Sequence, residues 1–581
     1  MPVYADGNAE TIYDSKKYKR QLRGWLSYAF ASEVFVIVSL TLFLPICLEQ
    51  FARDNGYLLP DKTIPCVTVG SSPIGQRDNI TAIPNEDQRC VVKLAWLWID
   101  SASFSLYVNS ISVALQALTV ISMGNIADHP PHRKRLLLSF AFFGATAATL
   151  FLLLPSSSPL WPVSALLGIC ANVGFGASIV AMNAYLPTLA RQSEEVVKHR
   201  AELLAAGASM PRASAGYVGD AELDIEEPLL SSEPRADGQN GDAEQSPQQV
   251  ESLQAAYNAS LSRATSRISS QGIALGYAAG ILLLLVALIP VTLLHGTTFA
   301  LCLAIGLSGI WWALFSLPAA AWLPSSSGTT AEREWSEEDG GERENWSTSR
   351  EIARAWKRLG GMLRWREIKR LRNTFQYLAA WFLLSDGFTT ITSTAVLFAK
   401  TTLHMPASSL ILVGIITPVS GIAGSLVWPH IQRRHGWTNL RVLVILVCLA
   451  SLVPVYGCLG FIKVFREGTV KFGGLTTPGE IFGLAVYFGS VYGAFQGYAR
   501  AFYSELIPHG EEARWYALFS ITDKSSSFVG PLVVGLIADT TGNIRYAFFF
   551  LVFMVWLSIP VLLSIDVDRG RNDAEKYKYR A

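Results

Sequence analysis

Long apolar runs separated by charged residues constrain this chain more than any other feature. An α-helix needs about 20 apolar residues to cross the roughly 30 Å hydrocarbon core of a bilayer. Hydrophobic residues make up 50% of the chain and charged residues only 16%. We therefore predict an all-α polytopic membrane protein. The sequence favours twelve spans, at 24–48, 102–124, 135–154, 160–186, 271–293, 297–323, 374–399, 408–429, 440–462, 480–506, 515–537 and 546–565.

Charge and motifs exclude several other classes of protein. A formal net charge of +1 argues against a nucleic-acid-binding protein. The sequence holds no phosphate-binding loop, dinucleotide fingerprint, zinc-protease motif or serine-hydrolase motif. We therefore expect no enzymatic activity, no cofactor and no bound metal. The expected partners are a small-molecule substrate and membrane lipids.

An even number of spans places both termini on one side of the membrane. Lys and Arg gather in the segments on that side, including 16–23, 133–135 and 569–580. Positive flanks are retained in the cytosol, so we expect cytosolic termini. The predicted organisation is an N-terminus at 1–23, helices 1–4 at 24–186 with a luminal loop at 49–101, a disordered cytosolic loop at 187–270, helices 5–6 at 271–323, a central cytosolic loop at 324–373, helices 7–12 at 374–565 and a cytosolic tail at 566–581.

The loops carry four further signals. The luminal loop contains a glycosylation sequon at Asn79 and two cysteines, Cys66 and Cys90, which either pair or remain free thiols. The segment Glu226–Leu230 resembles an acidic dileucine sorting signal that an adaptor would read, although such a short motif also arises by chance. The stretch 350–372 is basic, with apolar residues at helical spacing, and predicts an amphipathic helix on the anionic leaflet or, alternatively, a solvated linker.

The twelve spans read as two related sets of six. Ser32-Glu33 in helix 1 matches Ser385-Asp386 in helix 7 at a similar depth. Gly176-Ala177 in helix 4 matches Gly493-Ala494 in helix 10. Such internal repeats are typical of secondary transporters, whose substrate site lies between the halves. We therefore predict two six-helix bundles around a central site.

The loop after helix 2 resembles a signature of the major facilitator superfamily. Its residues are Gly124, Asp128 and a basic cluster from Arg133 to Arg135. In that superfamily the motif latches the cytoplasmic gate, so the resemblance implies a gating role for these residues. Pro130 and Pro131 lengthen the turn, and an ordinary basic loop that anchors the helix in the cytosol is the alternative interpretation.

Ionisable residues inside the predicted spans mark the candidate site. Such groups cost about 2.5–3.5 kcal/mol each to insert, so they normally face a cavity and serve a function. Glu33, Asp386, Asp523 and Lys524 lie near the predicted bilayer centre, and Arg500 lies nearer the cytosol. A site with both signs of charge suits a zwitterion, and a buried acid can also carry a proton.

Structural roles are the alternative for the same residues. Lys524 could pair with Glu33 or Asp386 and stabilise the bundle alone. Adjacent side chains on a helix diverge by about 100°, so Asp523 and Lys524 are not presumed partners. Asn183 and Gln496 are weaker candidates, because hydrogen bonds between helices explain them well.

Several stretches resemble one family. They are the segments 24–33, 48–53, 174–187, 504–508 and 524–531, which include Tyr28-Ala29-Phe30-Ala31-Ser32-Glu33 and Lys524-Ser525-Ser526-Ser527-Phe528. These are similar to the fungal autophagy-related protein 22 family, a branch of the major facilitator superfamily. The resemblance implies a vacuolar membrane protein that exports neutral amino acids such as leucine to the cytosol during autophagy. A transporter of another small solute, or a transporter-like nutrient sensor, remains the alternative.

Overall fold

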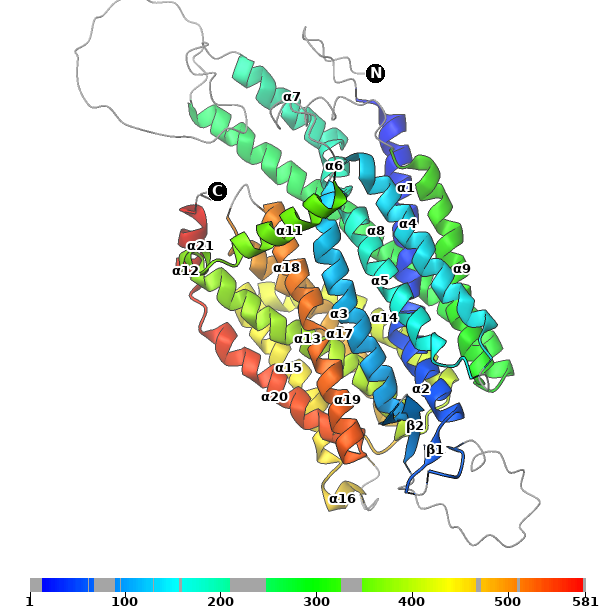
Figure 1. The fold of residues 1–581 in the computed structure, drawn as a ribbon. Helices are drawn as coiled ribbons and strands as arrows, with labels where there is room; N and C mark the ends of the chain where they lie inside the picture. The colour runs from blue at the N-terminus through cyan, green and yellow to red at the C-terminus, as the bar shows by residue number, and fades with distance from the viewer. Residues whose placement is uncertain are drawn as a thin grey trace, which may run out of the picture.

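The structure is a computed structural model that describes residues 13–60, 62–66, 89–94, 96–128, 130–155, 159–208, 247–324, 347–466, 472–508 and 512–577. Long helices run side by side, and a small β-sheet lies at one end of them (Figure 1). The first described helix begins and the last one ends at the opposite end (Figure 1). We call these the sheet end and the terminus end.

The first half of the chain makes six helical passes between the two ends. Pass 1 changes to a π-helix midway and then returns to an α-helix. The elements are α1 (Ser15–Val34), η1 (Phe35–Phe43) and α2 (Leu44–Asp54) in pass 1, α3 (Ser101–Asp128), α4 (Pro130–Thr149) with η3 (Leu150–Leu153), α5 (Val163–Asn183), α8 (Pro247–Leu293) and α9 (Thr298–Trp322).

The second half makes six more passes, and pass 11 is divided into two helices. Ten helices in the described part of the chain are long and apolar enough to span a membrane. The other two passes, α17 and the pair α18–α19, complete the twelve that the apolar runs predict. The elements are α13 (Arg372–Thr401), α14 (Ala407–His435), α15 (Asn439–Leu459), α17 (Pro478–Ser504), α18 (Glu512–Ser526), α19 (Val529–Thr541) and α20 (Ala547–Leu563).

Each half packs mainly on itself. In the first half α5 lies between α3 and α4, and α1 packs on α8 and α9. In the second half α17 packs along α14 and α15, while α20 packs on α13 and α15. The halves meet where α3 contacts α18 and α19, α8 contacts α14 and α2 contacts α13. This arrangement is the pair of six-helix bundles expected from the sequence.

Glycines let the helices of each bundle approach closely. The repeated Gly176 and Gly493 both pack against the second helix of their own half: Gly176 against Gln116 of α3, and Gly493 against the backbone of Gly421 in α14. In α8, Gly276 faces the side chain of Glu33. Small residues at such contacts are a common basis of helix association in lipid.

The loops at the terminus end are more ordered than we predicted. We expected disorder over 187–270, but α6 (Leu186–Arg191) and α7 (Glu194–Ala208) lie within it, and α8 already begins at Pro247. The reason is mutual burial, because α7 packs along α8 and buries Val196, Ala264 and Ile268. The predicted sorting segment Glu226–Leu230 falls in 209–246, outside the described residues.

Three further helices lie at the terminus end. The basic stretch 350–372 forms α11 (Thr348–Met362) and α12 (Trp365–Arg370) instead of one helix, and α21 (Val567–Glu575) follows α20. α11 packs against α3, where Trp356 Nε1 donates to Ser122 Oγ at 3.2 Å. The amphipathic segment therefore contacts the end of pass 2 (Figure 1).

The sheet end departs from an all-helical fold. Strands β1 (Tyr57–Leu58), β2 (Cys90–Leu94) and β3 (Leu97–Asp100) form an antiparallel sheet, with Val91 opposite Asp100. A disulfide joins Cys66 to Cys90, with 6.0 Å between the Cα atoms. Asn79 lies outside the described residues. Short elements α16 (Lys463–Arg466) and η5 (Ile544–Tyr546) complete this end.

Two glycines of α17 test the packing between α14 and α17. In Gly493→Leu the new side chain would meet the backbone of Gly421, whereas in Gly483→Leu it would meet open space. Overpacking costs about 1–3 kcal/mol, and Leu is the better helix former by up to about 1 kcal/mol. We expect Gly493→Leu to lower the thermal unfolding temperature of the purified protein and Gly483→Leu to leave it unchanged or raise it. Equal destabilisation by both variants would contradict this packing.

Candidate functional site

Glu33 lies where pass 1 changes its helical form. It is the last residue but one of α1, immediately before the π-helix that begins at Phe35. Its stem packs against Gly276 of α8, and its carboxylate is close enough to feel the charge of Lys524. Glu33 and Lys524 come from different halves, so the site is shared between the two bundles. π-helical segments are frequent at functional sites.

Lys524 has a second acidic neighbour. Its Nζ lies 3.5 Å from Oδ2 of Asp523, so these adjacent residues form an ion pair, contrary to our expectation that they would diverge. Both side chains remain partly exposed, at 43% for Lys524 and 31% for Asp523. The pairing occurs because both lie in the last turn of α18, where long side chains can bend toward each other.

Arg500 and two tyrosines complete the charged group. Tyr277 of α8 feels the charges of both Glu33 and Arg500. Tyr492 of α17 feels those of Asp523 and Arg500, and its side chain lies near that of Gln496. Arg500 is exposed and lies one turn before the end of α17. Four helices, α1, α8, α17 and α18, therefore contribute to this charged group, whose candidate residues are Glu33, Arg500, Asp523, Lys524 and Gln496.

Asp386 has a different environment. Its side chain is completely buried, and one carboxylate oxygen, Oδ1, accepts the backbone N–H of Gly530 at 3.0 Å and Thr390 Oγ1 at 3.3 Å. Gly530 belongs to the first turn of α19, where backbone N–H groups lack helical partners and a negative charge is stabilised. The sequence placed Asp386 beside Glu33, but the structure uses it to hold the start of a helix.

The break in pass 11 explains why Asp386 caps the start of α19. α18 ends at Ser526 and α19 begins at Val529, so the backbone between them loses regular hydrogen bonds. Ser110 of α3 donates to the carbonyl of Phe528 at 2.7 Å, and Ser385 Oγ donates to Oδ1 of Asp523. Neighbouring residues Ser385 and Asp386 thus hold the two sides of the break from α13.

A stack of aromatic rings supports the break within the second half. Phe388 stacks on Phe495 with ring centroids 4.0 Å apart and also on Tyr492 at 5.5 Å. Trp381 stacks on Phe519 of α18 at 4.4 Å. These rings come from α13, α17 and α18 and fix the relative positions of the three helices. Tyr492 is the member of the stack that also reaches the charged group.

The remaining predicted residues lie at the terminus end, away from this group. Asn183 is exposed at the end of α5. Arg133 is buried, donates to the Ala127 carbonyl at 2.9 Å and lies over the ring of Tyr185 at 5.1 Å. Arg133 thereby ties the end of α3 to pass 4 within its own half.

Two other predicted gate residues, Gly124 and Arg135, have more open surroundings than Arg133. Arg135 is exposed, and a side chain added at Gly124 would meet no atom within 4 Å. The side-chain position of Asp128 lies outside what the structure describes.

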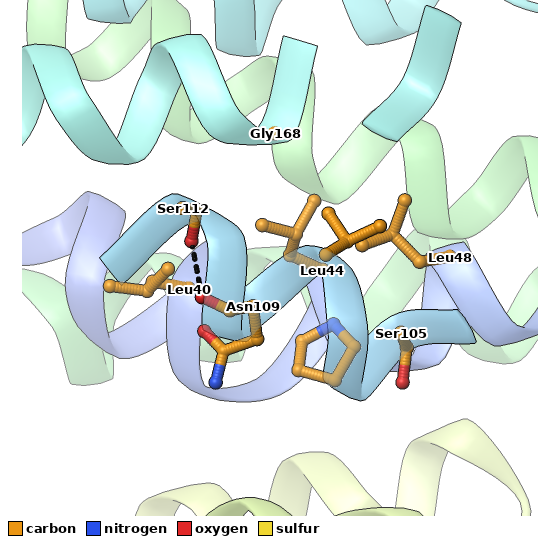
Figure 2. A pocket seen from close by; sticks show the side chains of 9 residues that line it. Leu40, Leu44, Leu48, Ser105, Asn109, Ser112 and Gly168 are labelled. Carbon is orange, nitrogen blue, oxygen red and sulfur yellow. Dashed lines mark hydrogen bonds between the residues drawn. The ribbon is translucent and has the colours of Figure 1, made fainter. Parts of the chain in front are cut away.

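A small pocket occurs elsewhere in the first half. Figure 2 shows it between pass 1, α3 and α5, with Asn109 and Ser112 among mostly apolar neighbours such as Leu44. None of the charged residues lines it. It therefore belongs to the packing of the first bundle.

The two halves touch chiefly toward the sheet end. Ser103 Oγ donates to the Gly535 carbonyl at 2.9 Å, and Gly414 of α14 faces Leu42 of η1 and Leu284 of α8. Toward the terminus end, Arg500 is exposed and Lys524 is partly exposed. Arg500 and Lys524 are therefore members of the charged group that keep exposed surface among the described residues.

Sequence reasoning missed Tyr277, Tyr492 and Ser385. Tyrosine and serine are common in membrane helices, so their identities carry little signal alone. The available clue was position next to a singled-out residue, and it applied to Ser385, which precedes Asp386. Tyr277 follows Gly276, whose contact with Glu33 only the structure shows. Among the described residues, no cluster of three or more His, Cys, Asp or Glu side chains could hold a metal ion.

Residues 17–575 match the family model described as "Vacuole effluxer Atg22 like". The chain is 39% identical over 589 residues to "Autophagy-related protein 22" of Cryptococcus neoformans, with 96% of this chain and 97% of that protein covered. It is 38% identical over 577 residues to "Autophagy-related protein 22-1" of Aspergillus fumigatus, with coverage of 96% and 91%.

A solved structure shares the fold. The D-xylose-proton symporter is 11% identical, with a TM-score of 0.50 and coverage of 96% of this chain and 99% of that one. At this identity the likeness concerns the fold alone, and it agrees with the predicted fold of two six-helix bundles.

The role of Asp386 can be separated from that of a substrate ligand. Asp386→Asn keeps a side-chain carbonyl that can accept the Gly530 N–H, whereas Asp386→Ala leaves that donor unpaired inside the bundle. An unpaired buried donor costs about 1–3 kcal/mol. We therefore expect the alanine variant to unfold at a lower temperature than the asparagine variant. Equal unfolding temperatures, measured on purified full-length protein, would argue against the cap.

Proposed function

Because the chain belongs to the family of vacuole effluxer Atg22-like proteins, we propose that it exports amino acids from the vacuole lumen to the cytosol. Transport would proceed by alternating access, with the two six-helix halves opening the central site first to one side of the membrane and then to the other. The family and the fold are those of a transporter. The substrate class rests on the chemistry of the site.

The juxtaposition of Glu33 and Lys524 across the two halves carries this proposal. A zwitterion offers an ammonium group to a carboxylate and a carboxylate to a cation, so it can bridge such a pair. Glu33 is placed for the ammonium group, and Lys524 or Arg500 for the substrate carboxylate. A substrate that bridges the halves stabilises the arrangement in which they are close together. Substrate binding is thereby linked to the conformational change.

Tyr277 and Tyr492 favour a small neutral side chain on the substrate. Both rings lie within the electrostatic field of the charged group, and Tyr492 is held by the aromatic stack. Aromatic walls bind apolar groups, and tyrosine hydroxyls also offer hydrogen bonds. A neutral amino acid such as leucine would match this lining.

The direction of transport follows from the proposed topology. We place the sheet end in the lumen and the terminus end in the cytosol, because the basic segments lie at the terminus end. The structure then corresponds to a state open to the cytosol. An acidic lumen would supply protons, and Glu33 is the site acid placed to carry one. The disulfide and the glycosylation site Asn79 would both face the lumen.

Other predicted segments take supporting roles in this proposal. The Gly124, Asp128, Arg133 and Arg135 motif would brace the terminus end when the cytosolic side closes. The exposed Trp356 and Trp365, together with the basic residues of α11 and α12, would rest on the anionic leaflet. The segment Glu226–Leu230 would route the protein to the vacuole membrane through a sorting adaptor.

Efflux from liposomes tests the function. Protein reconstituted in liposomes loaded with labelled leucine and an acidic interior should release leucine in a saturable manner. We expect Glu33→Gln and Arg500→Ala to reduce kcat/KM at least tenfold, which corresponds to about 1.4 kcal/mol of lost stabilisation. The matched control is Arg569→Ala, because Arg569 is a 69% exposed arginine on α21.

The outcomes distinguish the alternatives. Saturable efflux that Arg569→Ala preserves and Glu33→Gln abolishes supports amino-acid transport through this site. Efflux unchanged in both site variants would reject the assignment of the residues. Folded protein that releases no amino acid but does release another solute would reject the substrate class, and protein that releases no solute would favour a sensor.

A further inference from the structure

A second group of charges joins the two halves at the sheet end, far from the central site. Arg89 lies directly before β2 and reaches the end of α19, where its Nη2 donates to the carbonyls of Ala538 at 3.2 Å and Asp539 at 2.6 Å. A cation at a helix C-terminus is stabilised by the helix dipole. Asp539 lies fifteen residues beyond Lys524 in the sequence, about 20 Å along pass 11.

Two carboxylates lie in this group, and one of them, that of Asp100, is paired with Arg89. Asp539 Oδ1 accepts the backbone N–H of Asp100 at 2.9 Å, and Asp100 Oδ2 lies 3.7 Å from Arg89 Nε. The side chains are largely removed from solvent, with 15% exposed for Asp100 and 28% for Arg89. With both aspartates ionised, the group carries one net negative charge. Binding of one proton would make it neutral.

We propose that Arg89, Asp100 and Asp539 form a latch that holds the sheet end closed, and that Asp100 is a proton-binding site whose occupancy favours the closed latch. Arg89 and Asp100 belong to the first half, whereas Asp539 belongs to the second, so the sheet end cannot open unless these contacts separate. No residue of the latch belongs to the central site. The proposal rests on the proposed function only for naming the lumen as the source of the proton.

The neighbouring charged groups have partners of their own. Tyr107 of α3 faces both carboxylates of the latch. Ser101 Oγ donates to Glu49 at 3.4 Å, but Glu49 is already paired with Arg53 at 2.9 Å. From the second half, Lys400 of α13 interacts with Glu49 and Arg53, not with the latch. Within the described part of the chain, Arg89 is therefore the cation that faces Asp100.

The sign of the pH effect follows from burial. Burial raises the pKa of Asp100 to about 6, the adjacent Asp539 acts in the same direction, and Arg89 opposes them. An open latch would return Asp100 to water and to an ordinary pKa of about 3.9. The closed latch then binds the proton more tightly. Acidification from pH 7 to pH 5 should favour closure about tenfold, and raising the pH through 6 should remove that advantage.

This direction suits export from an acidic compartment. A proton taken from the lumen would close the sheet end and direct the site to the cytosol. Return of the empty carrier would follow loss of that proton when the sheet end reopens. Because the same proton returns to the lumen when the sheet end reopens, the latch would shift the population toward the cytosol-facing state without itself supplying the energy for export.

Distance measurements across the sheet end test the latch without transport. Spin labels at Trp96→Cys and Val464→Cys, on exposed positions of the two halves, would report the separation in full-length protein in nanodiscs, with the exposed Cys448 replaced by Ser. We expect the equilibrium constant for the short-distance population to rise about tenfold between pH 7 and pH 5. D100N should hold the closed state at both values, because the neutral side chain mimics the protonated acid.

D539N supplies the second variant. Its side-chain oxygen can still accept the Asp100 N–H, but the lost negative charge should move the pH midpoint of closure to a lower value. The proposal would be overturned by a population that opens on acidification, by a parent protein without a pH response, or by a D100N protein that keeps the parent's response. The distance measurement uses no substrate, so a negative result would not contradict leucine efflux. Likewise, an absence of leucine efflux would not contradict the latch.

Discussion

Backbone hydrogen bonding inside the bilayer is the constraint on which the rest of this structure depends. Lipid offers no partner for a free N–H or C=O, so a helix can break there only where other protein groups replace the lost bonds. Pass 11 breaks between Ser526 and Val529, and side chains from both halves supply the replacements. Ser110 comes from α3, while Asp386 comes from α13. The break therefore joins the two bundles at mid-height.

The same break shapes the central site. Asp523 and Lys524 lie in the last turn of α18, so the end of that helix presents both charges toward Glu33 and Tyr492. Lys524 pairs with Asp523 in its own helix and also lies within the electrostatic reach of Glu33 from the opposite half. Any change in the separation of the halves changes these interactions. The proposed site thus senses the conformation that substrate binding would alter.

α19 connects this site with the sheet end. It is a short helix of 13 residues, held at its start by Asp386 and at its end by Arg89. The same short helix therefore makes contacts at both the break and the latch. Asp386 stabilises the positive N-terminal end of α19. Asp100 pairs with Arg89, the arginine that caps the negative C-terminal end of the same helix.

The sequence by itself determined the membrane character, the twelve passes, the two related halves and the family, because hydrophobic length and local motifs need no tertiary information. It also singled out Glu33, Arg500, Asp523 and Lys524, since a charge in an apolar run is conspicuous. Only the tertiary structure separated Asp386 from Glu33, paired Asp523 with Lys524 and brought Arg89 to Asp539. Equivalent positions in a repeat share depth, but the partner that each side chain meets depends on where helices break and pack. Residues 450 positions apart meet only after the chain has folded.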